Sequence, residues 1–423
     1  MKRSIYTGLH YAMLPMVVGR LKWLARKHPG YGENIRQRFG YANAPDENPI
    51  WIHAVSVGET IAAEPLVKEI QRNHPEWPII ITNTTPTGAD QARRLFGESI
   101  SQQFAPYDLP AVIERYIERV KPRALVVMET ELWPNWIEIL RRKHIPILVA
   151  NARLSEKSAA GYARLGSMAS GMMASLTKVC PQYEADAQRF ISLGVPESSI
   201  TVTGNIKADI RITDADKQIA VTEKAAFGSV RSPVLIAAST HPGEDEIILD
   251  ALLKIRRKLP DALLYLAPRH VDRAPDIELL LRERSLEYSK RSESDVATKQ
   301  SAAVVLCDQM GELRGLFGAA DIALMGGTLV DHGGHNPLEP AAWEMPIFAG
   351  PSQRNFDSLF REMEAAEALL RVDASADSIE KNVVKLWSDD QRRKRVGAAA
   401  LSYLQAQRGA VNRILREIES LVD

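Results

Sequence analysis

The sequence is poor in cysteine, and it carries no excess charge of either sign. Its 423 residues contain two cysteines, Cys180 and Cys307, and its 53 basic residues are balanced by 53 acidic ones. Two isolated cysteines suit a reducing compartment and provide no metal-ligand spacing. The balanced charge argues against a nucleic-acid-binding protein, which normally has a basic excess. We therefore expect no nucleic-acid partner.

The N-terminal segment lacks the long apolar run of a membrane-spanning helix, which needs ~20 residues. Its uncharged run, Ser4–Gly19, has 16 residues and contains Pro15. No cleavage site of a secretory signal follows. Aromatic residues such as Trp23 lie among basic ones, which is typical of an anchor on an anionic membrane surface. We expect residues 1–30 to be this anchor; a helix packed on its own domain and a single tilted span are the alternatives.

What the chain does contain is a repeated alternation of apolar strand-like segments and amphipathic segments. Strand candidates occupy 50–55, 77–85, 123–130, 145–153, 176–182 and 200–206, then 232–240, 262–270, 302–310, 320–329 and 346–350. Segments with helical periodicity, such as 111–120, separate them. Near-continuous apolar strands separated by helices are typical of parallel sheets covered on both faces.

This pattern and the chain length predict an α/β protein with two Rossmann-like, doubly wound domains that face a central cleft. The expected parts are the anchor 1–30, a first domain 31–209, a polar linker 210–231, a second domain 232–405 and a C-terminal helix 406–423. Ligands of such sheets bind outside the carboxyl ends of the strands. Polar clusters that follow strands are therefore the candidate site residues.

Glu59 follows the first strand at a predicted helix start. An acid in the first turn of a helix gains about 0.3–1 kcal/mol from the helix dipole, which is a sufficient structural explanation. Alternatively, Gly58 leaves room for a substrate, and Glu59 accepts a proton from a hydroxyl group within about 3 Å. We expect the dipole to keep Glu59 ionised at some cost in basicity.

Other charged residues also follow predicted strands. Glu129 and Glu131 flank a strand-to-helix turn, where at least one is expected to face a ligand and one to cap the helix. Lys207 ends the first half and is expected to face an anionic donor. Arg269 is predicted to bind a phosphate or carboxylate in a forked geometry, or else is an exposed arginine at a sheet end.

A glycine-rich loop at 326–334 leads into a predicted helix start at Asn336–Glu339. It is neither a P-loop nor a dinucleotide fingerprint. Pro337 suits a first helical position, and the free N–H groups there suit a phosphate, while Glu339 suits ribose hydroxyls. The alternative is a flexible connection capped by Asn336.

The same loop contains three potential metal ligands, Asp331, His332 and His335. No fourth ligand lies at the spacing of a zinc motif. We therefore expect these side chains to contact substrate or order the loop, and we expect no metal.

Eight segments carry a family resemblance: HAVSVGE, NTTPTG, METELWPN, ARLS, GNIKAD, ASTHPGEDE, APRH and MGGTLVDHGGHNPLEPAAWE. In this order, between Ile5 and Asn355, they resemble the 3-deoxy-D-manno-oct-2-ulosonic acid (Kdo) transferases of Gram-negative lipopolysaccharide synthesis. The resemblance implies an inverting, metal-independent GT-B glycosyltransferase without a cofactor. It implies CMP-Kdo as donor, a tetraacylated lipid A precursor as acceptor, and anionic lipids of the inner membrane, on its cytoplasmic face, as partners.

The resemblance also implies roles for individual residues. Glu59 would be the proton acceptor, and Glu129 and Lys207 would assist at the transition state. The residues implied to contact CMP are Pro268, Arg269, Met310, Gly311, Glu312, Asn336, Pro337, Leu338 and Glu339. The alternative functions are another GT-B nucleotide-sugar transferase or epimerase acting on a soluble sugar, and a non-catalytic, nucleotide-sensing membrane adaptor.

Overall fold

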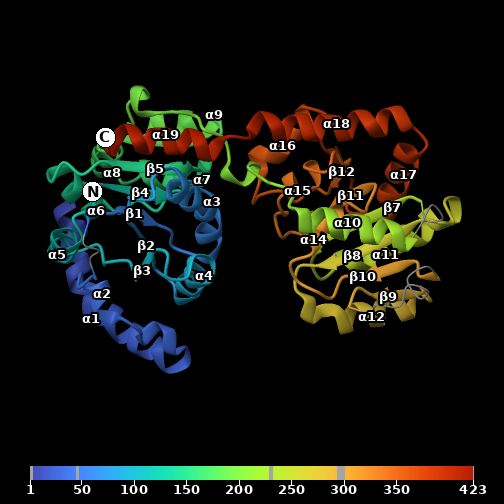
Figure 1. Cartoon of the computed structure of the whole chain (residues 1–423), viewed down its shortest axis with the longest axis horizontal. Helices are drawn as coiled ribbons and strands as arrows, with labels where there is room; N and C mark the ends of the chain where they lie inside the picture. Colours follow the sequence, from blue (N-terminus) through green and yellow to red (C-terminus); the bar gives the residue numbers. More distant parts are fainter. Residues whose placement is uncertain (1–2, 44–46, 228–231, 293–300, 423) are drawn as a thin grey trace. The chain divides into compact units, whose positions relative to one another are not determined.

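The computed structural model describes residues 3–43, 47–227, 232–292 and 301–422 (Figure 1). The chain divides into two compact units. The first unit comprises Met1–Asp209 and Arg408–Asp423, and the second comprises Ile210–Gln407. Each unit contains one parallel sheet with helices around it.

The sheet of the first unit has six strands in the order β3-β2-β1-β4-β5-β6, and every neighbouring pair is parallel. The strands are β1 (Ile50–His53), β2 (Ile79–Asn83), β3 (Ser101–Phe104), β4 (Ala124–Met128), β5 (Ile147–Ala152) and β6 (Lys178–Pro181). The chain builds the sheet outward from β1 in one direction and from β4 in the other. The topological switch point, where such sheets bind ligands, therefore lies between β1 and β4.

Helices cover both faces of this sheet because successive side chains of a buried strand point to opposite sides. Trp51 of β1 belongs to a core cluster with Tyr116 and Trp136, whereas Ile50 and Ile52 belong to the cluster on the other face. The helices are α1 (Arg3–Lys27), α2 (Ile35–Arg38), α3 (Val57–Asn73), α4 (Pro86–Phe96), α5 (Pro110–Val120), α6 (Pro134–Arg142), α7 (Glu156–Ala163), α8 (Ser167–Met173), α9 (Glu184–Ser192) and α19 (Ala410–Val422); the 3-10 turns are η1 (Pro29–Gly32), η2 (Glu197–Ser199) and η3 (Ile206–Ala208).

The C-terminal helix α19 returns to the first unit and packs against α3, β4 and β5 (Figure 1). Its start is fixed by Asp209, whose carboxylate accepts hydrogen bonds from the backbone N–H groups of Gly409 (2.5 Å) and Val411 (2.8 Å). Ile414 is fully buried in the core cluster that it shares with α3. The last residues of the chain thus complete the core of the first unit.

The sheet of the second unit has seven parallel strands in the order β13-β12-β11-β7-β8-β10-β9. They are β7 (Val234–Thr240), β8 (Leu263–Pro268), β9 (Tyr288–Lys290), β10 (Val304–Leu306), β11 (Ile322–Met325), β12 (Ile347–Ala349) and β13 (Leu370–Arg371). The surrounding helices are α10 (Asp214–Phe227), α11 (Glu244–Lys258), α12 (Ala274–Glu283), α14 (Leu313–Phe317), α15 (Leu338–Ala341), α16 (Asp357–Ala365), α17 (Ala376–Trp387) and α18 (Asp390–Gln407), with the turn η5 (Val271–Arg273). Here the switch point lies between β7 and β11.

The structure differs from the expected elements in several places. The segment 200–206 forms only an isolated bridge, from Ile200 to Val179, before it turns into η3. The strands β3, β9 and β13 were not predicted because they are short or polar. The expected linker, 210–231, contains helix α10, which packs against α14 within the second unit; its last residues, 228–231, lie outside the described residues.

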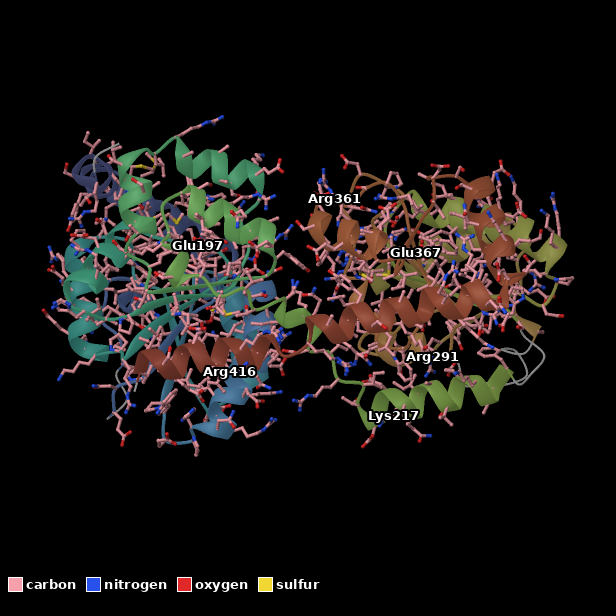
Figure 2. The ribbon with its side chains drawn as sticks, turned by 90° about the horizontal axis from the view of Figure 1, so that it is seen from above. Glu197, Lys217, Arg291, Arg361, Glu367 and Arg416 are labelled. Atoms are coloured by element: carbon pink, nitrogen blue, oxygen red, sulfur yellow. The ribbon has the colours of Figure 1, made fainter. Side chains whose placement is uncertain are left out.

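We expect Ile414→Ala to lower the stability of the first unit, although residue 414 follows the whole second unit in the sequence. Truncating a fully buried isoleucine costs about 2–5 kcal/mol. Differential scanning calorimetry of the full chain should show the transition of the first unit at a lower temperature and that of the second unit unchanged. Arg416→Ala, at an exposed position of the same helix (Figure 2), is the matched control and should shift neither transition. An unshifted first transition in Ile414→Ala would contradict the assignment of α19.

Candidate functional site

Glu59 lies in the first turn of α3, directly after the switch-point strand β1. Ser56 is the N-cap of α3, and its hydroxyl accepts a hydrogen bond from the backbone N–H of Glu59. In return, the Glu59 carboxylate accepts hydrogen bonds from the Ser56 hydroxyl (3.0 Å) and from the backbone N–H of Val55 (2.8 Å). This arrangement is a variant of the capping box. It holds the carboxylate at the carboxyl edge of the sheet.

The pKa of Glu59 is raised to about 7, mainly because the carboxyl group is largely withdrawn from water. The hydrogen bond from Val55 lowers the pKa, whereas the negative charges of Glu129 and Glu131 raise it further. The expectation that the helix dipole would keep Glu59 ionised at some cost in basicity is therefore wrong in direction, because the pKa is raised. Desolvation and like charges outweigh the two stabilising hydrogen bonds.

Glu129 is on the other side of the switch point, immediately after β4. Its backbone has a φ of 59°, a left-handed conformation that is unfavourable for a residue with a side chain and is concentrated at functional sites. Its N–H nevertheless donates to the carbonyl of Ala150 (2.9 Å). The pKa of Glu131 is raised by burial and by the charge of Glu129. Three carboxylates therefore influence one another at the switch point of the first sheet.

Lys207 lies in the turn η3, which packs against α3, the helix that starts with Glu59. The turn is held by two side-chain amides at the same edge of the sheet. Asn151 accepts a hydrogen bond from the N–H of Ile206 (3.1 Å), and Asn205 accepts one from the N–H of Lys207 (2.9 Å). The structure thus brings the three predicted catalytic residues to the carboxyl edge of one sheet.

In the second unit, Glu244 joins the two loops that flank the switch point. Its fully buried carboxylate accepts hydrogen bonds from the backbone N–H groups of His241 (2.9 Å), Gly327 (2.6 Å) and Leu329 (2.9 Å). Burial nevertheless raises the pKa of Glu244. Close approach is possible because residue 326 is glycine: a Cβ there would lie 2.2 Å from the carbonyl oxygen of Ser239.

Three histidine side chains come together at these loops. Nε2 of His241, after β7, lies 2.8 Å from Nε2 of His335 in the glycine-rich loop, and the His241 ring stacks on that of His332 with centroids 3.6 Å apart. Burial and neighbouring cationic groups lower the pKa of His241 and of His335 to about 4. Asp331, expected to accompany these histidines, instead pairs with Arg354 at 3.0 Å.

The expectation that this loop binds no metal stays a prediction. It was based on the spacing within one loop, whereas the structure brings in His241 from another strand end. The segment ASTHPGEDE carries part of the family resemblance, but the sequence pattern singles out neither His241 nor Glu244 within it. Only the pairing of β7 with β11 places them beside the loop.

The residues predicted to contact CMP follow β8, β10 and β11, which lie at or near the same switch point. Pro268 ends β8, and Arg269 after it is exposed, with its backbone N–H bonded to the carbonyl of Thr240 (3.0 Å). Met310 is 66% exposed, and Gly311 has a φ of 90°. The geometry leaves Arg269 and Met310 accessible to a ligand.

The two acids among these residues are held differently. Glu312 pairs with Arg291 (3.3 Å), which also pairs with Glu223; Figure 2 labels Arg291. Burial raises the pKa of Glu339, and the nearby Arg314 of α14 lowers it. The helix expected after Pro337 is only the short α15, Leu338–Ala341, where the Asn336 side chain accepts a hydrogen bond from the N–H of Leu338 (3.2 Å).

Two doubly wound units of this kind define the GT-B class of glycosyltransferases and related epimerases. A UDP-GlcNAc 2-epimerase of Neisseria meningitidis, crystallised with UDP-GlcNAc, matches with a TM-score of 0.61 and 16% identity, covering 89% of this chain and 100% of that one. A glycosyltransferase of Rickettsia africae matches with a TM-score of 0.57 and 14% identity, covering 89% and 98%. At these identities the likeness shows the fold alone.

Sequence comparison identifies the family. The profile of the 3-deoxy-D-manno-octulosonic-acid transferases (kdotransferases) matches residues 33–210. A 3-deoxy-D-manno-octulosonic acid transferase of Haemophilus influenzae is 38% identical over 98% of this chain and 97% of its own length, and one of Bordetella pertussis is 32% identical over 99% of both. The chain belongs to the 3-deoxy-D-manno-octulosonic acid transferase family.

We expect Glu244→Ala to destabilise the second unit and weaken its ligand binding, because three buried N–H groups would lose their acceptor. Each unsatisfied buried donor costs about 1–3 kcal/mol. Calorimetry should show the transition of the second unit at a lower temperature. Glu246→Ala, in the same helix turn, is the matched control because Glu246 accepts none of these three bonds. A Glu244→Ala protein as stable as the control would show that this carboxylate does not join the loops.

Proposed function

We propose that this chain transfers Kdo from CMP-Kdo to a hydroxyl group of a lipid A precursor, with inversion at the anomeric carbon, on the cytoplasmic face of the inner membrane. The relatives that match over nearly the whole chain are named for transfer of this sugar. The observation that carries the mechanism is a half-buried carboxylate, Glu59, with a pKa of about 7 at the switch point of the first sheet. A base of this pKa is well matched to proton transfer near neutral pH.

The reaction needs one base and one leaving group. The acceptor oxygen forms a bond to the anomeric carbon of Kdo while its proton passes to Glu59. The bond from that carbon to the phosphate oxygen breaks, and CMP leaves with the electron pair. Attack opposite the phosphate inverts the anomeric centre. No oxidant or reductant is required.

Charge stabilisation is the task of the remaining residues. Kdo has a carboxylate beside its anomeric carbon, and the departing CMP gains negative charge on its phosphate. Fixed cations and N–H donors aimed at such charge lower the barrier. Lys207 and Arg269 are the cations that we assign to this role. The donors are the N–H groups of Asn336 and Glu339, because Pro337 has none and that of Leu338 donates to the Asn336 side chain. Glu129, in its strained backbone conformation, would orient the acceptor or balance Lys207.

The runner-up function is a transfer or epimerisation that acts on a soluble nucleotide sugar, as the fold likeness alone would allow. The N-terminal helix α1 favours a membrane-borne acceptor instead. Six residues of α1 have large apolar side chains that are exposed, and Tyr11 is one of them. The other five lie three, four or seven positions apart, and they are Ile5, Leu9, Met13, Met16 and Trp23. Residues at this spacing share one face of a helix. We call these five residues the apolar stripe.

The apolar stripe has the features of a helix that lies on a membrane surface. None of the described helices combines the length and apolar character needed to cross a bilayer. The opposite side of α1 is fixed to the first unit, since Thr7 bonds to Asn135 (2.8 Å) and Arg3 pairs with Glu138 (3.6 Å). Basic residues end the helix, and Lys27 lies over the ring of Trp23 at 4.4 Å. Apolar insertion together with attraction to anionic lipid is typical of interfacial helices.

We expect Glu59→Gln to abolish transfer while CMP affinity and thermal stability stay close to those of the wild type. Glutamine keeps the size and hydrogen-bonding shape of the side chain but removes the base. Product formation from CMP-Kdo and the lipid A precursor should be measured by mass spectrometry, and CMP binding by calorimetry. Arg269→Ala is the complementary variant, and it should weaken CMP binding. Transfer by Glu59→Gln at a near wild-type rate would remove Glu59 from the mechanism.

The pH dependence of transfer follows from the same group. Because the active form is the carboxylate, kcat/KM should fall about tenfold per pH unit below the pKa of about 7 and level off above it. Glu131→Gln removes a like charge near Glu59, so the acid limb should move to lower pH. An acid limb that moved to higher pH in this variant would contradict the assignment.

We expect Leu9→Glu with Met16→Glu to reduce binding to vesicles that contain anionic lipid. Both positions are exposed, so the folded first unit should retain its melting temperature. Vesicle flotation measures the effect, and transfer to a soluble acceptor analogue should persist. Val221→Glu with Leu279→Glu, which changes two exposed apolar residues of the second unit, is the matched control. Equal flotation of both double variants would contradict a membrane role for the apolar stripe.

A further inference from the structure

The three histidines at the switch point of the second sheet form a compact set of nitrogen ligands. One ring nitrogen from each of His241, His332 and His335 lies within 4.8 Å of the others. The closest pair, Nε2 of His241 and Nε2 of His335, is 2.8 Å apart. Zn–N bonds of about 2.0–2.1 Å at tetrahedral angles separate two ligand nitrogens by ~3.3 Å. A shift of a few tenths of an ångström thus opens this pair to a metal ion.

The backbone that carries these histidines is ordered before any ligand arrives. Glu244 binds the N–H of His241 and that of Gly327, which joins the two loops. Gly334 donates to the carbonyl of Gly327 (2.7 Å), and the Asn355 side chain donates to the carbonyl of His332 (3.1 Å). Preorganised loops of this kind lower the entropic cost of ligand binding.

We propose that His241, His332 and His335 form a binding site for a divalent transition metal of the zinc class. Three imidazoles with a fourth position left for an exogenous ligand are a common donor set for Zn²⁺. His241 is buried, His335 is half-buried and His332 is exposed, so an ion has access from the side of His332. The site combines a residue that follows β7 with residues of the glycine-rich loop after β11. His241 and His335 are 94 positions apart in the sequence.

The short contact between two of the rings shows that the cluster contains a lone pair. Nε2 of His241 and Nε2 of His335 face each other at 2.8 Å, the distance of a hydrogen bond between one donor and one acceptor nitrogen. At least one of the two nitrogens therefore presents a lone pair inside the cluster, which is the group that a metal ion needs.

Nearby cationic side chains disfavour the binding of a metal cation, and they favour an anion as its fourth ligand. Arg269 and Arg273 are close enough to influence His241. Arg273 is paired with the buried carboxylate of Asp245, which reduces its effect, and Arg269 is exposed to screening solvent. The remaining positive field favours an anionic fourth ligand, such as hydroxide or a phosphate oxygen. The affinity for Zn²⁺ should therefore rise when inorganic phosphate is added.

The test uses the untagged full chain and the metal alone. Calorimetry with Zn²⁺ should show one site per chain, and Co²⁺ should give the visible absorption of a tetrahedral nitrogen-rich site. Loss of one protein ligand should lower the affinity at least about tenfold, since even outer-shell changes cost 10–100-fold. His332→Gln is the main variant, because a substitution at an exposed position should leave the packing of the fold intact. His335→Gln is the second variant.

His270→Gln is the matched control, because the ring of His270 lies 6.4 Å from that of His241 and His270 is not in the ligand set. It should bind Zn²⁺ like the wild type. Absence of Zn²⁺ binding, or an equal loss of affinity in His270→Gln and His332→Gln, would overturn the proposal. Binding is measured without donor or acceptor, so either result would leave the proposed transfer reaction untouched.

Discussion

The partial burial of one carboxyl group, that of Glu59, is the constraint on which the electrostatics of the first unit's switch point depend. An exposed acid in the first turn of a helix would be a weak base, because the helix start and the N–H of Val55 stabilise its charge. Withdrawal from water, with Glu129 and Glu131 close by, reverses this effect and raises the pKa to about 7. The strand order brings these acids together, because β1 and β4 are neighbours. Glu59 lies in the helix that follows β1, and Glu129 directly follows β4.

The second unit has the same kind of switch point, but the carboxylate there has a different role. Its switch point also carries a buried carboxylate at the start of the helix that follows the first strand, yet Glu244 is fully enclosed and accepts three backbone hydrogen bonds. Glu244 therefore shapes the loops, whereas Glu59 keeps part of its surface accessible. We propose proton transfer as the role of Glu59, whereas Glu244 orders the glycine-rich loop and the histidines beside it.

Much of the fold followed from the sequence, because buried parallel strands such as β4 and β5 are nearly continuous apolar runs. Polar or very short strands, such as Ser101–Phe104, lack that signal. The membership of the C-terminal helix in the first unit and the packing of α10 depend on tertiary contacts. The candidate residues were found at strand ends, but the raised pKa of Glu59 and the meeting of His241 with His335 required the strand order.

The most direct test of the central claim is the titration of Glu59 itself. Carboxyl ¹³C NMR of the first unit's glutamates in the full chain, with Glu59→Gln to assign the resonance, measures its pKa without any assumption about the reaction. Burial beside Glu129 and Glu131 predicts a midpoint of about 7. A midpoint near 4.5, the value of an unperturbed glutamate, would show that Glu59 is an ordinary capping acid and would contradict its role as the base.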